Sequence, residues 1–349
     1  MEIRELKIVA KTIEYCAVTV ALLASALGLI IIAELVLPAV LAYKRDRAMQ
    51  YNKEAIKKHQ EKHYKEAVGI YNKAIHIYPR LALSYYNRGN CFFALKDYEK
   101  VLQDYNDALK FNPSYTQVYN SRGNTYYLLG DYVKAIADYT QAVKFNPHYE
   151  QAYYNRGNAY YKLNDYQSAL ADFNQAIEIN PDYAESYNNL GNTYMALNHY
   201  IKAIENYDKA IDINPDYAQA YSNRGNGYYH LNNFVQAIVN YAKSIAIDSQ
   251  NYEVYTNRGN AYYALQKYKE AIKNYDQALM IYPNYIEAYY NRGLAQTKLK
   301  QKQGAIADLQ QAVQFAQQQG NQRLLEVIKD AIEKLQTNQK IPNVLPIQR

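Results

Sequence analysis

The sequence lacks tryptophan altogether and contains only two cysteines, Cys16 and Cys91, in 349 residues. Two cysteines cannot build the disulfide framework of a small secreted domain. Apolar residues make up 49% of the chain, which is too many for a disordered protein. Cys16 lies in an apolar segment, and Cys91 takes a position that otherwise holds alanine, threonine or glycine. We therefore expect both thiols to be unreactive.

Motifs for catalysis and for metal or nucleotide binding are missing as well. The sequence has no glycine-rich phosphate loop and no strand-turn-helix nucleophile motif. His59 and His63 have the spacing of a metal-binding pair on a helix, but no acidic residue or cysteine is placed to complete a zinc site. We expect solvated histidines there, and no enzyme activity, small-molecule substrate, cofactor or metal.

A basic stripe is also absent from the central part of the chain. Residues 82–319 contain 21 Lys and Arg against 22 Asp and Glu, so the net charge of +6 comes from the flanking segments. Nucleic-acid binding needs positive charge gathered along one face, so neither DNA nor RNA is an expected partner. We expect the carboxylates on solvated faces and as helix N-caps, such as Asp182 and Asp216.

What the sequence does have is a repeat of 34 residues. One glycine marks it, and positions are numbered here so that this glycine is position 8 of its unit. Within each half of a unit the apolar residues recur three and four apart, which predicts two amphipathic helices. A break such as "LND" separates the helices, and a proline at position 32 stops the second in most units. The repeated glycines are Gly89, Gly123, Gly157, Gly191, Gly225, Gly259 and Gly293.

This pattern resembles the tetratricopeptide repeat family, whose unit is a 34-residue helix-turn-helix. The resemblance covers residues 82–319 as seven units and residues 48–81 as an eighth, degenerate one with Ala55 in place of the glycine. It implies an all-α fold, a right-handed superhelical solenoid of about eight repeats over residues 48–319. Of the 42 tyrosines, 40 lie in this stretch and are expected to pack between units.

The array is expected to end in a capping helix. Residues 320–336 place Leu324, Ile328, Ile332 and Leu335 on one helical stripe, which would cover the last repeat and leave a polar outer face. Residues 337–349 follow as a C-terminal tail.

The N-terminal segment differs in kind from the repeats. After a flank at residues 1–15, residues 16–43 contain a single charged side chain, Glu34. An apolar run of this length predicts one transmembrane helix. Cleavage of a signal peptide at "ASA" (residues 24–26) is the competing interpretation, but the apolar run continues well past it. We therefore expect an uncleaved anchor.

The charges on either side of this segment predict its orientation. Three Lys and Arg precede it, whereas residues 44–62 carry seven. The side richer in Lys and Arg is usually cytoplasmic, so we expect a single-pass membrane protein with its repeats in the cytosol. A basic linker at residues 44–47, with Lys44, Arg45 and Arg47, would lie beside the anionic headgroups.

The resemblance further implies that the first helix of each unit lines a concave groove. Asparagines at positions 6 and 9 would face water there, and a ladder of carboxamides can both donate to and accept from the backbone of an extended peptide. Tyrosines at positions 5 and 12 would add flat contact area. The expected groove residues are Asn87, Asn90, Asn124, Tyr154, Asn155, Asn158, Tyr161, Asn189, Asn192, Asn223, Asn226, Tyr229, Asn257, Asn260, Tyr263 and Asn291.

Other interpretations of these residues stay open. The asparagines also agree with the family consensus, so they can serve packing and hydrogen bonding without a ligand. The arginine at position 7 of most units is expected to be structural and to pack over a neighbouring tyrosine ring. Position 2 is neutral or acidic throughout, which argues against a clamp for the acidic C-termini of chaperones.

Together these features predict a membrane-anchored scaffold. It would bind a partner protein or extended peptide in the groove, for example during assembly of a membrane complex. The alternative is a structural element that associates with a second copy of itself at the membrane.

Overall fold

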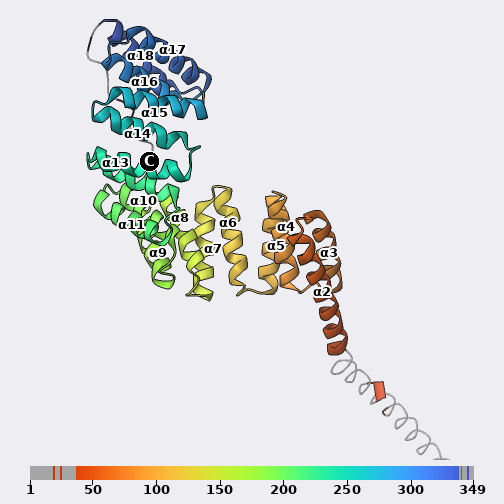
Figure 1. Ribbon diagram of the computed structural model, residues 1–349. Helices are drawn as coiled ribbons and strands as arrows, with labels where there is room; N and C mark the ends of the chain where they lie inside the picture. The colour runs from red at the N-terminus through yellow and green to blue at the C-terminus, as the bar shows by residue number, and fades with distance from the viewer. Residues whose placement is uncertain (1–18, 20–23, 26–36, 338, 340–343, 346–349) are drawn as a thin grey trace, which may run out of the picture. The chain divides into compact units, whose positions relative to one another are not determined.

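The computed structural model describes residues 19, 24–25, 37–337, 339 and 344–345. In these residues every regular element is an α-helix, from α2 to α18, and the helices form consecutive pairs (Figure 1). The pairs are α2 (Leu37–Gln60) with α3 (Tyr64–Ile77), α4 (Ala82–Ala94) with α5 (Tyr98–Phe111), α6 (Thr116–Leu128) with α7 (Tyr132–Phe145), α8 (Glu150–Lys162) with α9 (Tyr166–Ile179), α10 (Ala184–Ala196) with α11 (Tyr200–Ile213), α12 (Ala218–His230) with α13 (Phe234–Ile247), α14 (Tyr252–Ala264) with α15 (Tyr268–Ile281), and α16 (Ile286–Lys298) with α17 (Lys302–Gln318).

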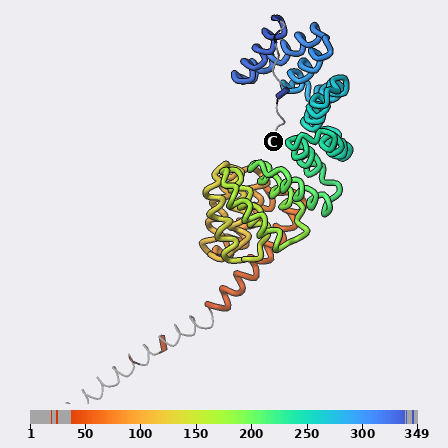
Figure 2. Tube along the Cα trace, turned by 90° about the vertical axis from the view of Figure 1, so that its left-hand side faces the viewer, coloured from red at the N-terminus to blue at the C-terminus, as the bar shows by residue number. Residues whose placement is uncertain are grey.

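The predicted all-α array of helix-turn-helix units is therefore confirmed. A last helix, α18 (Gln322–Gln336), follows the eighth pair. The chain divides into two compact units, residues 1–147 and 148–349. Within each unit a helix packs mainly on the helices before and after it in sequence, as the tube in Figure 2 shows. The handedness of the superhelix stays a prediction.

Each pair turns through one residue in the left-handed region, at position 15. In the pair α4–α5, Lys96 has φ of 61°, its N–H donates to the carbonyl of Phe93 (2.9 Å), and the N–H of Asp97 donates to that of Phe92 (3.0 Å). These two bonds close the end of a helix in the Schellman pattern. Asp97 then accepts a bond from the N–H of Lys100 and so begins the next helix.

The helix caps differ in place from those expected. Asp182 and Asp216 are not N-caps, because α10 and α12 begin after Tyr183 and Tyr217, whose side chains make no capping bond. The capping side chains instead come mostly at position 16, directly after the left-handed residue, where they reach the free N–H groups of the second helix. They are Asp97, Asp131, Asp165 and Asn233, with Asn251 and Asn321 capping α14 and α18.

The glycine at position 8 brings the two helices of a unit together. A Cβ atom on Gly191 would meet Cε1 of Tyr207 at 2.6 Å, and one on Gly259 would meet Cε1 of Tyr275 at 2.5 Å. Both rings, at position 24, are buried, and so is the small residue at position 20, such as Ala203. The aromatic ring thus lies directly on the backbone of the first helix, which explains why a glycine is needed there.

The predicted anchor lies largely outside the described residues. Among the residues that are described, no helix is both long and apolar enough to cross a membrane. The helix α2 runs without a break from Leu37 to Gln60, so the predicted linker at residues 44–47 is helical and continuous with the first repeat. Ala48, Asn52 and Ala55 form its buried face.

The capping helix α18 lies where it was expected, but a different stripe is buried. Leu325, Ile328, Ala331 and Leu335 face the last repeat, whereas Leu324 and Ile332 are only partly buried. Ala331 is the one small side chain on this stripe, and α18 packs there against a cluster that includes Leu309 and Ala316 of α17.

Candidate functional site

The predicted groove residues all lie on the first helices of the pairs, from α4 to α16. Positions 5 and 6 each lie three or four residues from position 9, and position 12 lies three residues beyond it, so all four positions lie on one side of the helix. Within residues 148–349, each of these first helices contacts the first helix of the next pair, so the face continues from one repeat to the next.

The carboxamide at position 9 is held by the second helix of its own unit. Its Oδ1 atom accepts a bond from the hydroxyl of the tyrosine at position 24, at 2.6–2.8 Å. Phe173 takes position 24 in the unit of Asn158, and because it has no hydroxyl it cannot make this bond. These tyrosine bonds turn the oxygen of each asparagine toward the interior of the unit and leave its amide nitrogen on the outer side. They join Tyr105 to Asn90, Tyr139 to Asn124, Tyr207 to Asn192, Tyr241 to Asn226 and Tyr275 to Asn260.

The same oxygen accepts a second bond from the next unit. The donor is Nδ2 of the asparagine at position 6, and we call the two residues an asparagine pair. In a pair whose position 9 also meets a tyrosine, both lone pairs of that oxygen are used, which leaves Nδ2 of position 9 and Oδ1 of position 6 for other partners. The four pairs are Asn158–Asn189 (2.8 Å), Asn192–Asn223 (3.0 Å), Asn226–Asn257 (3.3 Å) and Asn260–Asn291 (2.9 Å).

Burial corrects the expectation that these side chains face water for four of the twelve predicted asparagines, and the other eight are partly exposed. Asn260 and Asn291 are each 1% exposed, Asn257 is 7% exposed and Asn226 is 9% exposed. The bonds to tyrosine and to the neighbouring asparagine hold these four carboxamides between the helices. Replacing them with alanine would therefore leave buried hydrogen-bonding groups without partners. The asparagines carry a structural role whether or not a ligand binds.

The predicted tyrosines are anchored by neighbouring rings. The Tyr154 ring lies 5.0 Å from Tyr183, and its hydroxyl accepts a bond from Nδ2 of Asn189 (3.1 Å). Tyr263 meets Tyr268 edge-on at 5.2 Å, and burial raises the pKa of Tyr263 to about 12. Tyr229 meets Phe234 at 5.2 Å in the same way. Such fixed rings offer contact area at little entropic cost.

Two cavities open beside these residues, one in each compact unit. The cavity in residues 148–349 has a volume of about 240 Å³ and brings together Tyr161, Asn192, Asn223 and Asn226. Met195 and Gln219 complete much of its wall, so the lining is part apolar and part amide. The chemistry suits one apolar side chain of a ligand with backbone groups beside it.

The cavity in residues 1–147 has a volume of about 340 Å³ and brings Asn90 and Asn124 together with His59. His59 is not simply solvated, because its Nδ1 lies 3.2 Å from Sγ of Cys91. Burial raises the pKa of Cys91 to about 12, as expected for an unreactive thiol. Within the described residues there is no cluster of three or more His, Cys, Asp or Glu that could hold a metal.

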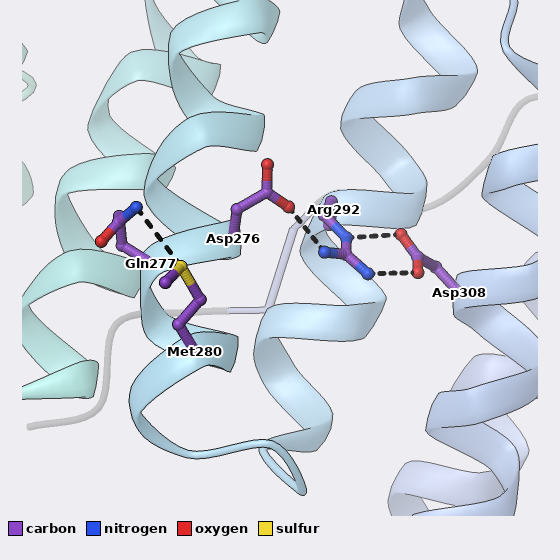
Figure 3. Close-up of polar contacts among 5 residues, drawn as sticks. All are labelled: Asp276, Gln277, Met280, Arg292 and Asp308. Atoms are coloured by element: carbon purple, nitrogen blue, oxygen red, sulfur yellow. Dashed lines mark hydrogen bonds and ion pairs between the residues drawn. The ribbon is translucent and has the colours of Figure 1, made fainter.

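An arginine clamp, which the sequence reasoning missed, joins the two helices of a unit. Arg122 at position 7 donates through Nε and Nη2 to Asp138 at position 23, at 2.8 and 2.6 Å. The predicted stacking is confirmed, since its guanidinium also lies 5.6 Å from the Tyr119 ring. Figure 3 shows the clamp at Arg292, which lies between Asp276 of the preceding unit and Asp308 of its own.

The aspartates of this clamp are buried rather than solvated. Burial raises the pKa of Asp104, Asp138 and Asp172, although the arginine bonds oppose this shift. The sequence carries only a partial signal of the clamp. Every aspartate at position 23 occurs in a unit with an arginine at position 7, and the unit with Leu190 has Asn206 there, but Arg224 and Arg258 also face an asparagine.

The predicted basic linker is exposed on α2. Lys44, Arg45 and Arg47 all lie on the surface, and Arg45 makes one ion pair with Asp46, at 3.6 Å. Their positive charge is therefore accessible.

One asparagine pair holds a stretch of peptide backbone from a distant part of the chain. The N–H of Leu345 donates to Oδ1 of Asn291 (2.9 Å), and Nδ2 of Asn260 donates to the carbonyl of Leu345 (3.4 Å). These are the two groups that the pair leaves available.

Comparison with known proteins places this geometry in a family. Models of the TPR repeat and the tetratricopeptide repeat match several segments between residues 82 and 319. Curated protein sequences gave no match. The matched segments are 82–115, 123–164, 157–198, 184–217, 225–266, 259–300 and 286–319.

Solved structures of low identity share the fold. They include a tetratricopeptide repeat protein from Parabacteroides merdae (18% identity, TM-score 0.58, 71% of this chain and 98% of that one). They also include the C-terminal part of a TPR repeat-containing protein from Cytophaga hutchinsonii (18% identity, TM-score 0.56, 68% and 97%). A third is the APC/C hetero-tetramer Cut9–Hcn1 (15% identity, TM-score 0.56, 78% and 52%). With the repeat matches and the helix pairs in agreement, the chain belongs to the tetratricopeptide repeat family, whose members are generally scaffolds for protein–protein interaction and are typically non-catalytic.

Proposed function

We propose that the protein is a membrane-anchored scaffold that holds an extended segment of a partner protein along its asparagine pairs, at the cytoplasmic face of a membrane, during assembly of a membrane complex. The observation that carries this proposal is the bracketing of Leu345 by Asn260 and Asn291. A carboxamide pair that binds one residue's N–H and C=O binds backbone, so it accepts many sequences.

The same frame recurs along residues 148–349, which supports binding of a segment several residues long. Each frame presents a donor from position 9 and an acceptor from position 6. Asn189 and Asn192 belong to neighbouring pairs, and there the acceptor of one frame and the donor of the next bond each other (3.2 Å). A ligand backbone that used both frames would replace that internal bond.

The anchor rests on the apolar run at residues 16–43 and on the basic residues that follow it. Exposed Lys44, Arg45 and Arg47 on α2 have the charge to attract anionic headgroups, at about 1 kcal/mol each. Since α2 continues directly into the first repeat, this placement would hold the array close to the membrane surface.

The proposal is tested by Asn192→Asp combined with Asn226→Asp in the full-length protein. Each new carboxylate keeps the oxygens that accept from tyrosine and from the next asparagine, but it loses the amide that would donate to a ligand carbonyl. We expect the helical signal to persist and the native partner to be lost from affinity purification out of detergent-solubilised membranes. Loss of two neutral hydrogen bonds costs about 1–3 kcal/mol, roughly five- to 150-fold in affinity.

The matched control is Asn174→Asp, the same chemical change at an exposed residue on α9. It should leave capture of the partner intact. Equal capture by the groove variant and this control would show that the asparagine pairs do not bind the partner. Recovery of only a second copy of this chain would favour the self-associating structural element instead.

A further inference from the structure

We infer that the C-terminal tail, residues 337–349, is an intramolecular ligand of the groove and competes there with the partner. This inference rests on the proposed function, because it names the regulation of the same site. The described residues of the tail that carry it are Val344 and Leu345.

The backbone geometry comes first. Leu345 uses its N–H and its C=O at once, the first to Asn291 on α16 and the second to Asn260 on α14. Both side-chain carboxamides are held in place by bonds within the array, since Oδ1 of Asn260 accepts from the hydroxyl of Tyr275 (2.8 Å) and from Nδ2 of Asn291 (2.9 Å). The pair is therefore preorganised for this contact, which reduces the entropy lost on binding.

Apolar packing supports the same placement of the tail. The side chains of Val344 and Leu345 are partly buried against a cluster that includes Ile286, Tyr290 and Leu294. The tail thus combines backbone bonds with burial of two apolar residues, as an extended peptide ligand does.

The sequence of the tail favours an extended backbone at this point. Pro346 directly follows Leu345 and disfavours the helical region for it, and Pro342 precedes the Val344–Leu345 stretch. Pro346 also has no N–H of its own that would need a partner. A partner segment that displaces the tail should share this chemistry, namely an apolar residue followed by proline.

Covalent linkage makes the tail a strong competitor. A short tether gives an effective concentration in the millimolar range. A free peptide whose intrinsic Kd is about 100 μM would then bind about tenfold more weakly while the tail is in place. Release of the tail should uncover that affinity.

The experiment uses the full-length protein in detergent with Leu345→Asp, which places a charge against the apolar cluster and should release the tail. The control is Gln339→Ala, an exposed residue of the same tail. The probe is a fluorescent peptide of residues 338–349. We expect the Leu345→Asp protein to bind it about tenfold more tightly than the wild type or the control. Adding Asn260→Asp to the released protein should abolish the gain.

Hydrogen–deuterium exchange gives a second readout that needs no partner. In the wild type the tail peptide containing Leu345 should exchange at least about tenfold more slowly than the free synthetic peptide, and Leu345→Asp should remove that protection. Exchange at the free-peptide rate in the wild type, or equal probe binding by wild type and Leu345→Asp, would overturn the inference.

The failures of the two proposals differ. A protected tail with no partner lost from the Asn192→Asp, Asn226→Asp variant refutes the proposed function and leaves the tail contact standing. Loss of the partner from that variant together with an unprotected tail supports the proposed function and refutes the tail contact.

Discussion

At the residue scale, polar side chains inside the array are arranged so that almost every one has a specified partner. The asparagine at position 9 accepts from a tyrosine of its own unit and from an asparagine of the next, so it joins three helices at one atom. Most arginines at position 7 similarly reach an acid, either in their own unit, as Arg122 does with Asp138, or in the unit before, as Arg224 does with Asp208. A buried charge paired in this way costs much less than an isolated one.

Arg258 differs from these arginines because no described bond joins it to an acid. Its only described bond runs from Nε to Oδ1 of Asn274 (2.6 Å), and burial lowers the pKa of Arg258 because no carboxylate offsets it. We expect Asn274→Asp to complete the bidentate pair, raise that pKa and stabilise the protein by about 1 kcal/mol. Urea unfolding followed by circular dichroism measures the change.

Its control is Asn206→Asp, at the same position of the unit in which Leu190 replaces the arginine. A carboxylate there gains no cation, so we expect no gain in the free energy of unfolding. Equal stabilisation by both changes would mean that the arginine is not the cause.

At the element scale, what joins the helices of a pair is a ring pressed against a glycine. Tyr207 cannot move away from Gly191 without loss, since its hydroxyl is bonded to Asn192 (2.8 Å). The left-handed residue at position 15 then sets how the second helix returns along the first. The pair is thus fixed at both ends, by a turn and by a contact.

We expect Gly191→Ala to destabilise the protein by about 1–3 kcal/mol through overpacking against Tyr207, although alanine is the better helix former. The matched control is Gly69→Ala in α3, where a Cβ would meet nothing within 4 Å. That change should stabilise by about 0.5–1 kcal/mol. Thermal unfolding of both variants measures the two changes in stability. A loss of similar size in both would mean that overpacking against Tyr207 is not the cause.

At the scale of the whole molecule, stability is spread over a row of neighbouring interfaces rather than gathered in one core. Buried tyrosines recur along the array, so the effects of their ionisation on stability add up along the chain. Burial raises the pKa of Tyr290 to about 12, and it also raises the pKa of Tyr207, Tyr241 and Tyr275 well above the ordinary value. Unfolded tyrosines ionise near pH 10.

Stability should therefore fall in alkali. A tyrosine whose pKa is raised by folding contributes stability that is fully present below about pH 10 and is lost as the pH rises toward its folded value. At pH 11 each such tyrosine costs about 1.4 kcal/mol. We expect urea midpoints to drop steadily from pH 9 to pH 11, and Tyr207→Phe, which copies the natural Phe173, to lessen the drop. A midpoint independent of pH over this range would contradict the buried tyrosines.

The orientation of the whole chain is a separate prediction. A reporter active only in the cytoplasm, fused after Arg349, should be active because seven Lys and Arg follow the apolar segment and three precede it. Changing Lys44, Arg45 and Arg47 together to Glu should weaken this preference. Activity of a periplasmic or lumenal reporter in its place would refute the predicted topology.

The sequence by itself determined the period and the helix pairs, because both follow from spacing within 34 residues. Only the tertiary structure decided which side chains bond to one another. Asn260 and Asn291 lie 31 residues apart, and Leu345 lies 54 residues beyond Asn291, so no local pattern links them. The arginine clamp spans 16 residues and two helices in the same way. Burial of Asn226, Asn257, Asn260 and Asn291 was missed for the same reason, since it depends on bonds from three helices that meet only when the repeats stack.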